Sequence, residues 1–373
     1  MGTFGCFDKL YYLMIDQSEN LLTFTRLGIG HPANSIEQSV DWPALKNIAD
    51  HQGLSAIVLD GLNALLNSHS QLSSLNSQLK LSWIGEVLQN YEQRYERCRK
   101  TIGKLAKFYN DHGFKLMVLK GYGLSLNYPK PNHRPCGDID IWAFGQYREA
   151  DTAISKELSI QIEHDHHHHT VFEFEGFTVE NHYDFLNVHY GHRNAELEKV
   201  LKDLAMDDRF STPIEGQKVY LPSPNLHALF ILRHMMHNFS ATSMNLRQVL
   251  DWAFFVEKNT GEIDWEWLLM VLDEYHMLEF FNILNAICVD DLGFGADIFP
   301  SVQFLPDIKA RVLNDIISPE FGGTTPQNIF KRAIFKYRRW QANAWKQDLC
   351  YGDSRYRSLF EGVWSHLLKP ASI

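Results

Sequence analysis

Three kinds of feature are missing from this sequence of 373 residues. It has no run of about 18 consecutive apolar residues, which is the usual signal of a transmembrane helix. Its first residues include acidic side chains and no basic stretch followed by an apolar run, unlike a secretory leader. The five cysteines form no Cys-x-x-Cys pair. We therefore expect a cytoplasmic protein with no membrane partner, no disulfide framework and no zinc knuckle.

Positive charge is also in short supply. Aspartate and glutamate number 45 against 35 lysines and arginines, so the formal net charge is −10. A protein that binds duplex nucleic acid over a broad surface needs a basic excess, and this composition disfavours such a partner. The hydrophobic share of 45% and the charged share of 21% are typical of globular proteins. The length allows two or three domains.

Hydrophobic periodicity divides the chain into three parts. Residues 1–112 carry apolar residues at three- and four-residue spacing, which predicts helices at 7–15, 41–66 and 81–113. Residues 113–222 mix short apolar strands with turns and a helix at 146–159. Residues 223–373 return to helical spacing. The pattern predicts an α+β fold, with a small mixed β-sheet core between an N-terminal helical region and a C-terminal helical domain.

The stretch KGYGLSLNYPKPNHRPCGDIDIW, residues 120–142, contains the main motif. Asp138 and Asp140 lie one residue apart in an apolar strand, so both point to one face while Ile139 and Ile141 point to a core. Two carboxylates about 7 Å apart on one strand face can bind Mg²⁺ ions that also contact substrate phosphates. The pair alone is a short and common pattern, and two solvent-facing residues of an edge strand explain it as well.

A later segment, GFTVENHYDF, offers a third carboxylate. It is the second strand of a hairpin predicted around the glycine turn at residue 176. Alternation places Glu180 and His182 on the face opposite Val179, where a neighbouring strand could add Glu180 to the aspartate pair. Glu173 and Glu175 on the first strand of the hairpin are weaker candidates for the same place.

Together these segments resemble a known family. An apolar strand that ends in a glycine turn, a helix, a strand with Asp-x-Asp and a later carboxylate strand resemble the DNA polymerase beta-like nucleotidyltransferase superfamily. VLKGYGLSLNYPKPNHRPCGDIDIW with the later VENH is similar to a branch of largely uncharacterised bacterial nucleotidyltransferases, over about residues 40–255. The sequence departs from the wider pattern at Tyr122, where a serine usually follows the turn glycine.

The resemblance implies a reaction and its metal. Asp138 and Asp140 would bind two Mg²⁺ ions, with Mn²⁺ as the alternative, and Glu180 would bind the catalytic one and offer a general base. A nucleoside monophosphate would pass from an NTP to a hydroxyl or phosphate of an acceptor. Gly121 and Gly123 would let the backbone approach the triphosphate. The departure at Tyr122 keeps a second reading open, a degenerate fold that binds a nucleotide or a partner without catalysis.

Three further side chains near the motif each have two readings. Lys120 reaches a phosphate, or it pairs with an aspartate at the strand end. Arg134 binds a phosphate or a site carboxylate, or it lies in a solvated loop. His182 orients Glu180 or contacts the acceptor, or it is an ordinary half-buried strand histidine.

The C-terminal helices add candidates on the substrate side. His234 and His237 share one helix face, and Arg247 lies four residues before Asp251. The simple interpretation is that the histidines are hydrogen-bonded within a packed helix and that Arg247 and Asp251 form an intrahelical ion pair. The functional interpretation is that this helical domain closes over the nucleotide. The acidic balance favours a small molecule, a sugar, an antibiotic or a protein as acceptor, and the end of a tRNA stays open.

The run HDHHHH at residues 164–169 suggests a metal site. Successive strand residues alternate between faces, so at most His167 with His169, or His166 with His168, would share a face. No acidic or cysteine partner has clear ligand spacing. We therefore do not expect a catalytic metal here, and we keep a Zn²⁺- or Ni²⁺-binding protein built on this run as a third hypothesis.

Overall fold

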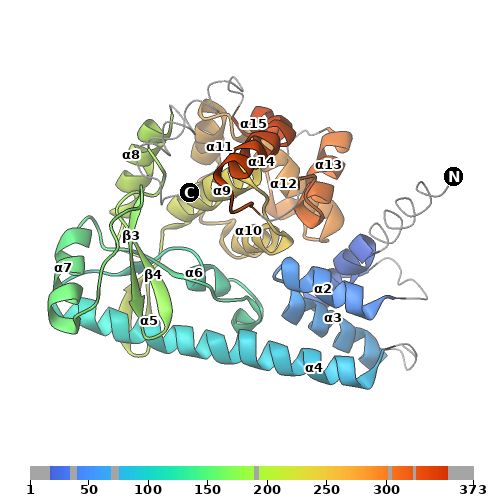
Figure 1. The fold of residues 1–373 in the computed structure, drawn as a ribbon, viewed down its shortest axis with the longest axis horizontal. Helices are drawn as coiled ribbons and strands as arrows, with labels where there is room; N and C mark the ends of the chain where they lie inside the picture. Colours follow the sequence, from blue (N-terminus) through green and yellow to red (C-terminus); the bar gives the residue numbers. More distant parts are fainter. Residues whose placement is uncertain are drawn as a thin grey trace.

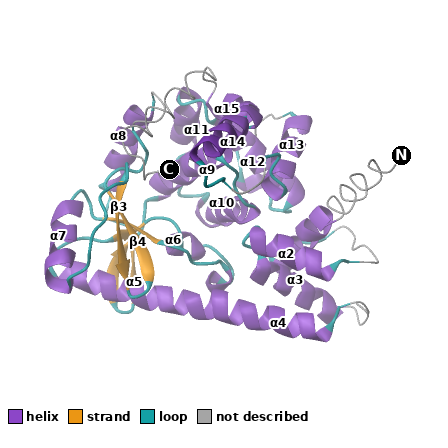
Figure 2. Ribbon diagram, viewed as in Figure 1, coloured by secondary structure: helices purple, strands orange, loops and turns teal. Residues whose placement is uncertain are grey.

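The computed structural model describes residues 17–33, 40–68, 75–188, 193–300, 305–321 and 325–351 of the chain. The helix expected at residues 7–15 lies outside these ranges. Within them the chain forms a six-stranded mixed sheet flanked by helices, which confirms the predicted α+β class (Figures 1 and 2). No helix in the described ranges is long and apolar enough to cross a membrane.

The first helices pack very closely. A helix over residues 17–28 is followed by α2 (Trp42–His51) and α3 (Ser55–Ser68). The Asp41 side chain caps α2 by accepting a hydrogen bond from the Ala44 amide. A Cβ at Gly61 would lie 2.0 Å from the Phe24 carbonyl oxygen, and one at Gly28 would lie 2.0 Å from that of Ile57. Only glycine therefore fits where these helices cross.

One long helix runs along the base of the molecule in Figure 1. It consists of α4 (Ser77–Val87), a π-helical turn η1 (Leu88–Glu92) and α5 (Gln93–Asp111), and it ends before Gly113, whose φ is +74°. Trp83 packs in the larger hydrophobic core, which joins helices to one face of the sheet, whereas Ile102 packs in a second core against the other face of the sheet. The long helix therefore joins the two cores.

The sheet has the strand order β3-β4-β2-β1-β6-β5. Its strands are β1 (Met117–Val118), β2 (Ile139–Trp142), β3 (His169–Phe174), β4 (Phe177–His182), β5 (Ser211–Ile214) and β6 (Gln217–Tyr220). The pairs β2–β4 and β1–β6 are parallel, and the others are antiparallel. Between strands lie α6 (Tyr122–Ser125), η2 (Pro131–His133), α7 (Tyr147–Leu158) and α8 (Asn194–Ala205). The β3–β4 hairpin was predicted, whereas α8 and the β5–β6 hairpin were not.

The rest of the described chain is helical, as predicted. It comprises α9 (Pro224–Ala241), α10 (Leu246–Asn259), α11 (Trp265–Glu274), α12 (Leu278–Ala286), η3 (Ile287–Asp291), η4 (Ala296–Ile298), α13 (Pro306–Ile317), α14 (Ile329–Ala342) and α15 (Ala344–Tyr351). Ser223 caps α9 by accepting a hydrogen bond from the Leu226 amide. Buried residues of α9 and α10 share one hydrophobic core with α2 and α3, so segments far apart in the sequence form one helical body.

Candidate active site

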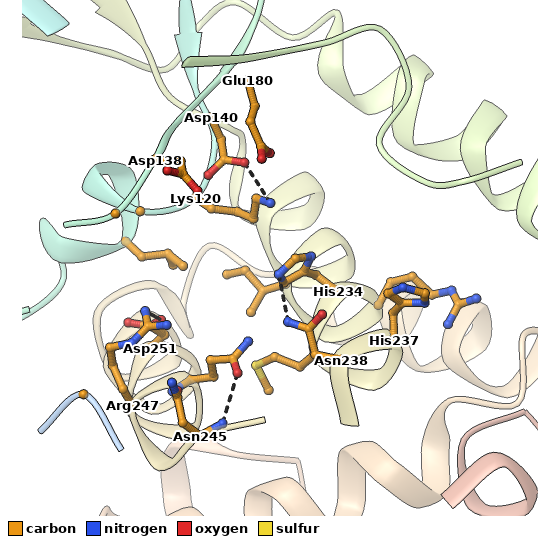
Figure 3. A pocket seen from close by; sticks show the side chains of 18 of the residues that line it. Lys120, Asp138, Asp140, Glu180, His234, His237, Asn238, Asn245, Arg247 and Asp251 are labelled. Atoms are coloured by element: carbon orange, nitrogen blue, oxygen red, sulfur yellow. Dashed lines mark hydrogen bonds and ion pairs between the residues drawn. The ribbon is translucent and has the colours of Figure 1, made fainter. Parts of the chain in front are cut away.

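The structure brings Asp138, Asp140 and Glu180 together. Parallel pairing of β2 with β4 sets Asp140 directly beside Glu180, and Asp138 immediately precedes β2 (Figure 3). All three line one cavity of about 720 Å³, together with Lys120. We call these four residues the strand wall of the cavity. The expected face pattern of both strands is therefore present, and it gathers carboxylate oxygens from two strands at one place.

Lys120 and His182 contact the inner carboxylates. Lys120 Nζ lies 2.8 Å from Asp140 Oδ1. The fully buried His182 has Nε2 3.1 Å from Asp140 Oδ1 and 3.5 Å from Glu180 Oε2. Burial alone would raise the pKa of Asp140, but Lys120 and His182 hold it well below its usual range. Burial likewise opposes ionisation of Glu180, and His182 brings its pKa below the ordinary value.

Asp138 has a different environment. Its side chain has no direct hydrogen bond or ion pair with any described residue, and it is exposed to the cavity. Partial burial raises the pKa of Asp138, and the negative charges of Glu180 and Asp140 raise it further. The positive charges of Lys120 and Arg94 offset this rise only in part, so negative charge prevails around Asp138.

The glycine turn packs against this site. Gly121 has φ +54°, and a Cβ there would lie 3.3 Å from the carbonyl oxygen of Asp138. A Cβ at Gly123 would lie 3.1 Å from the Val118 carbonyl oxygen. Tyr122, which follows the turn glycine, is 5% exposed and stacks on Tyr95 in the sheet core, with ring centroids 5.2 Å apart. Its side chain therefore contributes to the core and does not line the cavity.

Arg134 is neither in a solvated loop nor paired with a carboxylate of the strand wall. It is buried, and its Nε and Nη2 donate to Asp251 Oδ1 and Oδ2 at 2.7 and 3.0 Å. The Tyr128 hydroxyl donates to Asp251 at 2.7 Å, and Arg247 pairs with it at 3.1 Å. We call these four residues the Arg134–Asp251 clasp. The expected ion pair between Arg247 and Asp251 is present. The closer partner of Asp251 is Arg134, which comes from the loop before β2.

The opposite side of the cavity is helical. His234, His237 and Asn238 of α9 line this side, with Asn245 before α10 and Arg247 in its first turn, and His234 lies toward the carboxylates (Figure 3). The Asn238 amide and His234 Nε2 lie 3.1 Å apart. Burial lowers the pKa of His234 well below its ordinary value, so its imidazole is neutral at pH 7. We call this surface, with Asp251, the helix wall.

The N-terminal helices also reach the cavity, which sequence reasoning missed. Asp50, His51 and Gly53 at the end of α2 line it. A Cβ at Gly53 would lie 3.1 Å from Cδ of Arg247, so glycine lets the arginine lie against the backbone. In the sequence, His51–Gly53 look like an ordinary helix end, and nothing in them indicates a functional site. The cavity therefore draws on the sheet and on both helical segments.

The histidine run differs from its prediction. The strand β3 begins only at His169, and residues 166–168 form a bend, so strand alternation does not govern them. His168 and His169, which are adjacent in sequence, both approach His182, with ring centroids 5.6 and 5.2 Å away. An acidic neighbour is also present, because His169 Nε2 lies 3.9 Å from Glu180 Oε1.

The comparison with family models agrees with the sequence resemblance. A family model described as "uncharacterised nucleotidyltransferase" matches residues 38–290. None of the curated proteins matches the chain. One solved structure, an antigenic nucleotidyltransferase-like protein from Paracoccidioides brasiliensis, is similar at a TM-score of 0.35 and 12% identity, covering 55% of this chain and 97% of that one. The family match extends over more than half of the sequence, and the chain thus belongs to the uncharacterised nucleotidyltransferase family.

Proposed function

We propose that this protein is a Mg²⁺-dependent nucleotidyltransferase that moves a nucleoside monophosphate from an NTP to an acceptor. One observation carries the proposal. The parallel register of β2 and β4 sets Asp140 beside Glu180, with Asp138 next to both, on the wall of a cavity large enough for a nucleotide. Membership of the nucleotidyltransferase family supports the reaction class.

The residues present fit a divalent metal. Mg²⁺ prefers oxygen ligands, and the three carboxylates supply them at one place. The raised pKa of Asp138 and its lack of a direct partner indicate that the site is short of positive charge. When bound there, such ions would stabilise the attacking and leaving oxygens of an in-line displacement at the α-phosphorus, with pyrophosphate leaving.

The surrounding side chains prepare the carboxylates for this task. Lys120 and His182 keep Asp140 ionised despite its burial, and His182 does the same for Glu180. An ionised Glu180 can accept the proton of an acceptor hydroxyl as well as bind metal. The Gly121 turn lies beside Asp138 and leaves room for a triphosphate near the metal ligands.

The acceptor in this proposal is a small polar molecule. The helix wall stands across from the carboxylates, so the cavity of about 720 Å³ is bounded on both sides. A volume of this size suits a nucleotide with a small partner rather than a long polymer. The helix wall offers amides, imidazoles and one guanidinium, which can hydrogen-bond hydroxyl or carbonyl groups.

Thermal denaturation with each NTP, with and without Mg²⁺, tests the proposal. A ligand that binds the native state at one hundred times its Kd adds about 2.7 kcal/mol of stability, which raises Tm by several degrees. We expect a Mg²⁺-dependent rise for at least one NTP that disappears in Asp138→Asn. The preferred NTP then enters a screen of acceptors for pyrophosphate release. A rise that persists in Asp138→Asn would place the nucleotide elsewhere.

A second candidate is nucleotide binding without transfer. The Lys120–Asp140 ion pair favours it, because this ammonium group neutralises a metal-ligand carboxylate without any ion. The burial of Tyr122 favours it too, because no serine hydroxyl stands at this position directly after Gly121. This candidate predicts an NTP-induced rise in Tm that needs no Mg²⁺ and no pyrophosphate release with any acceptor. The two candidates therefore differ in their response to a chelator such as EDTA.

A further inference from the structure

A cluster of three histidines lies at the edge of the cavity. His169 at the start of β3 pairs across the hairpin with His182 at the end of β4, and His168 adjoins them. The rings of His168 and His169 are 4.4 Å apart between centroids, and both face the ring of His182. One nitrogen of each histidine lies within 4.8 Å of the others.

Two of these imidazoles have an unsatisfied nitrogen. Nδ1 of His168 and Nδ1 of His169 are buried and have no hydrogen-bond partner in the described part of the chain. His169 is only 7% exposed, yet it lines the cavity together with His168. Buried polar atoms are normally hydrogen-bonded, because burial without a partner costs about 1–3 kcal/mol. A ligand that accepts the lone pair of such a nitrogen would remove that cost.

Glu180 adds an oxygen to the cluster. Its Oε1 lies 3.9 Å from His169 Nε2, and its Oε2 lies 3.5 Å from His182 Nε2. The ligands of a tetrahedral Zn²⁺, held at about 2.0–2.1 Å, are about 3.4 Å apart. The His182–Glu180 separation is already close to that value, whereas Glu180 and His168 belong to different groups of ligand atoms within 4.8 Å, so both side chains must move toward a shared ion.

We propose that His168, His169 and His182 bind a transition-metal dication of the Zn²⁺ class, with Glu180 as the fourth ligand. The donor set gives the class, because imidazole nitrogens suit Zn²⁺, Co²⁺ and Ni²⁺, whereas Mg²⁺ prefers oxygen. This site differs from the carboxylate site of Asp138 and Asp140, but it shares Glu180 with it. It also uses His182, whose Nε2 otherwise contacts Asp140.

The shared ligands have a regulatory consequence, which rests on the proposed function. An ion held by the histidines would take Glu180 and His182 from the carboxylate site, so the two metal sites cannot be fully occupied together. Zn²⁺ would then inhibit Mg²⁺-dependent transfer, and the inhibition would need His168.

Metal binding is measured without nucleotide, so this test is independent of the transferase proposal. Metal-stripped full-length protein is titrated with Zn²⁺ against a chromophoric chelator and with Co²⁺ while its visible absorption is recorded. We expect one tight site per chain with the intense spectrum of tetrahedral Co²⁺. Affinity should fall at least tenfold in His168→Ala, in His168→Gln and in His169→Ala.

Two variants serve as matched controls. His164→Ala removes an exposed histidine of the same run, and Asp138→Asn removes a carboxylate that is not among the four ligands. Both should bind Zn²⁺ as the wild type does. Any of three results would overturn the proposal. The Zn²⁺ affinity could be unchanged in both His168 variants, Asp138→Asn could lower it as much as the His168 variants do, or equimolar Mg²⁺ could displace the Zn²⁺. If Zn²⁺ binds as expected and no NTP raises Tm, the transferase proposal fails alone.

Discussion

The two walls of the cavity use charge in opposite ways. On the helix wall, Asp251 accepts hydrogen bonds from Arg134 and Tyr128 and pairs with Arg247, so its charge is fully compensated. On the strand wall, Asp138 has no direct partner, and partial burial together with its neighbours Glu180 and Asp140 raises its pKa. A satisfied network fixes structure, whereas an unsatisfied carboxylate is a place where a ligand gains free energy. The comparison separates a structural ionic network from a candidate binding site within one cavity.

A substitution in the strand wall should lower activity without lowering stability. In Asp138→Asn we expect the rate of pyrophosphate release to fall about 10³- to 10⁴-fold, about 4–5 kcal/mol, because a metal ligand is lost. The free energy of unfolding should stay constant or rise slightly, because the raised pKa shows that the charge of Asp138 is penalised in the folded state. Initial rates and urea unfolding measure the two effects.

Glu173→Gln is the matched control for this prediction. Glu173 is exposed on β3 and accepts a hydrogen bond from Thr178, so it is a carboxylate of the same hairpin outside the cavity. Its rate should equal that of the wild type. A loss of activity in Glu173→Gln as large as in Asp138→Asn would contradict the assignment of the site.

A substitution in the Arg134–Asp251 clasp, which supports the helix wall, should lower stability. Arg134→Ala leaves the buried Asp251 without its bidentate partner, and breaking one side of a buried ion pair costs about 3–5 kcal/mol. Urea unfolding measures this loss. Arg209→Ala provides the control, because Arg209 pairs with Asp207 at 81% exposure and should change stability by less than about 0.5 kcal/mol. Equal effects of the two variants would remove the contrast between the walls.

A buried histidine of α9 should make the protein sensitive to acid. Burial lowers the pKa of His227 to about 4, against about 6.5 in an unfolded chain. Between these values the unfolded state binds more protons, so stability falls as the pH falls from about 6.5 towards 4. We expect His227 to account for about 2 kcal/mol of the loss between pH 7 and pH 4.5.

His227→Phe isolates this contribution, because a phenyl ring does not titrate and the site already contacts Phe255. Urea unfolding from pH 7 to pH 4.5 should be less pH-dependent in the variant by that amount. Parallel pH profiles of the variant and the wild type would show that His227 already titrates normally in the folded state.

The smallest effect concerns Lys120, whose Nζ competes with a metal ion for Asp140 Oδ1. In Lys120→Gln we expect Mg²⁺, measured calorimetrically without nucleotide, to bind roughly five-fold more tightly, about 1 kcal/mol. If Mg²⁺ affinity is unchanged while the affinity for the NTP with Mg²⁺ decreases, Lys120 acts on a phosphate instead. That result would favour the other reading of this lysine.

Local sequence rules predicted the strand wall well. Alternation predicted that Asp140 of β2, Asp138 just before it and Glu180 of β4 would lie toward one place, because a two-residue period is an intrinsic property of a strand. The family resemblance is confirmed by the match over residues 38–290. The catalytic roles of these residues and the division of the chain at residues 112 and 222 stay predictions.

Local sequence rules did not predict three other features of the structure. Arg134 and Asp251 are 117 positions apart, and nothing in either segment indicates the other. The β5–β6 hairpin was missed although Glu215 and Gly216 form a turn like that of Glu175 and Gly176, because its strands are short and only partly apolar. The histidine run was misread because a strand was assumed before His169, where the chain bends.

The long helix α4–α5 has a mechanical consequence for access to the cavity. It measures about 50 Å at about 1.5 Å per residue, and its two halves are anchored in different cores. Such a rod resists separation of the cores, since moving them apart would bend it or strip one half from its core. Only the π-helical turn at Leu88–Glu92 departs from the regular ladder of hydrogen bonds along it. The rod therefore opposes a swing of one core against the other as the way into the cavity, and this stiffness would hold the walls of the cavity at a fixed separation.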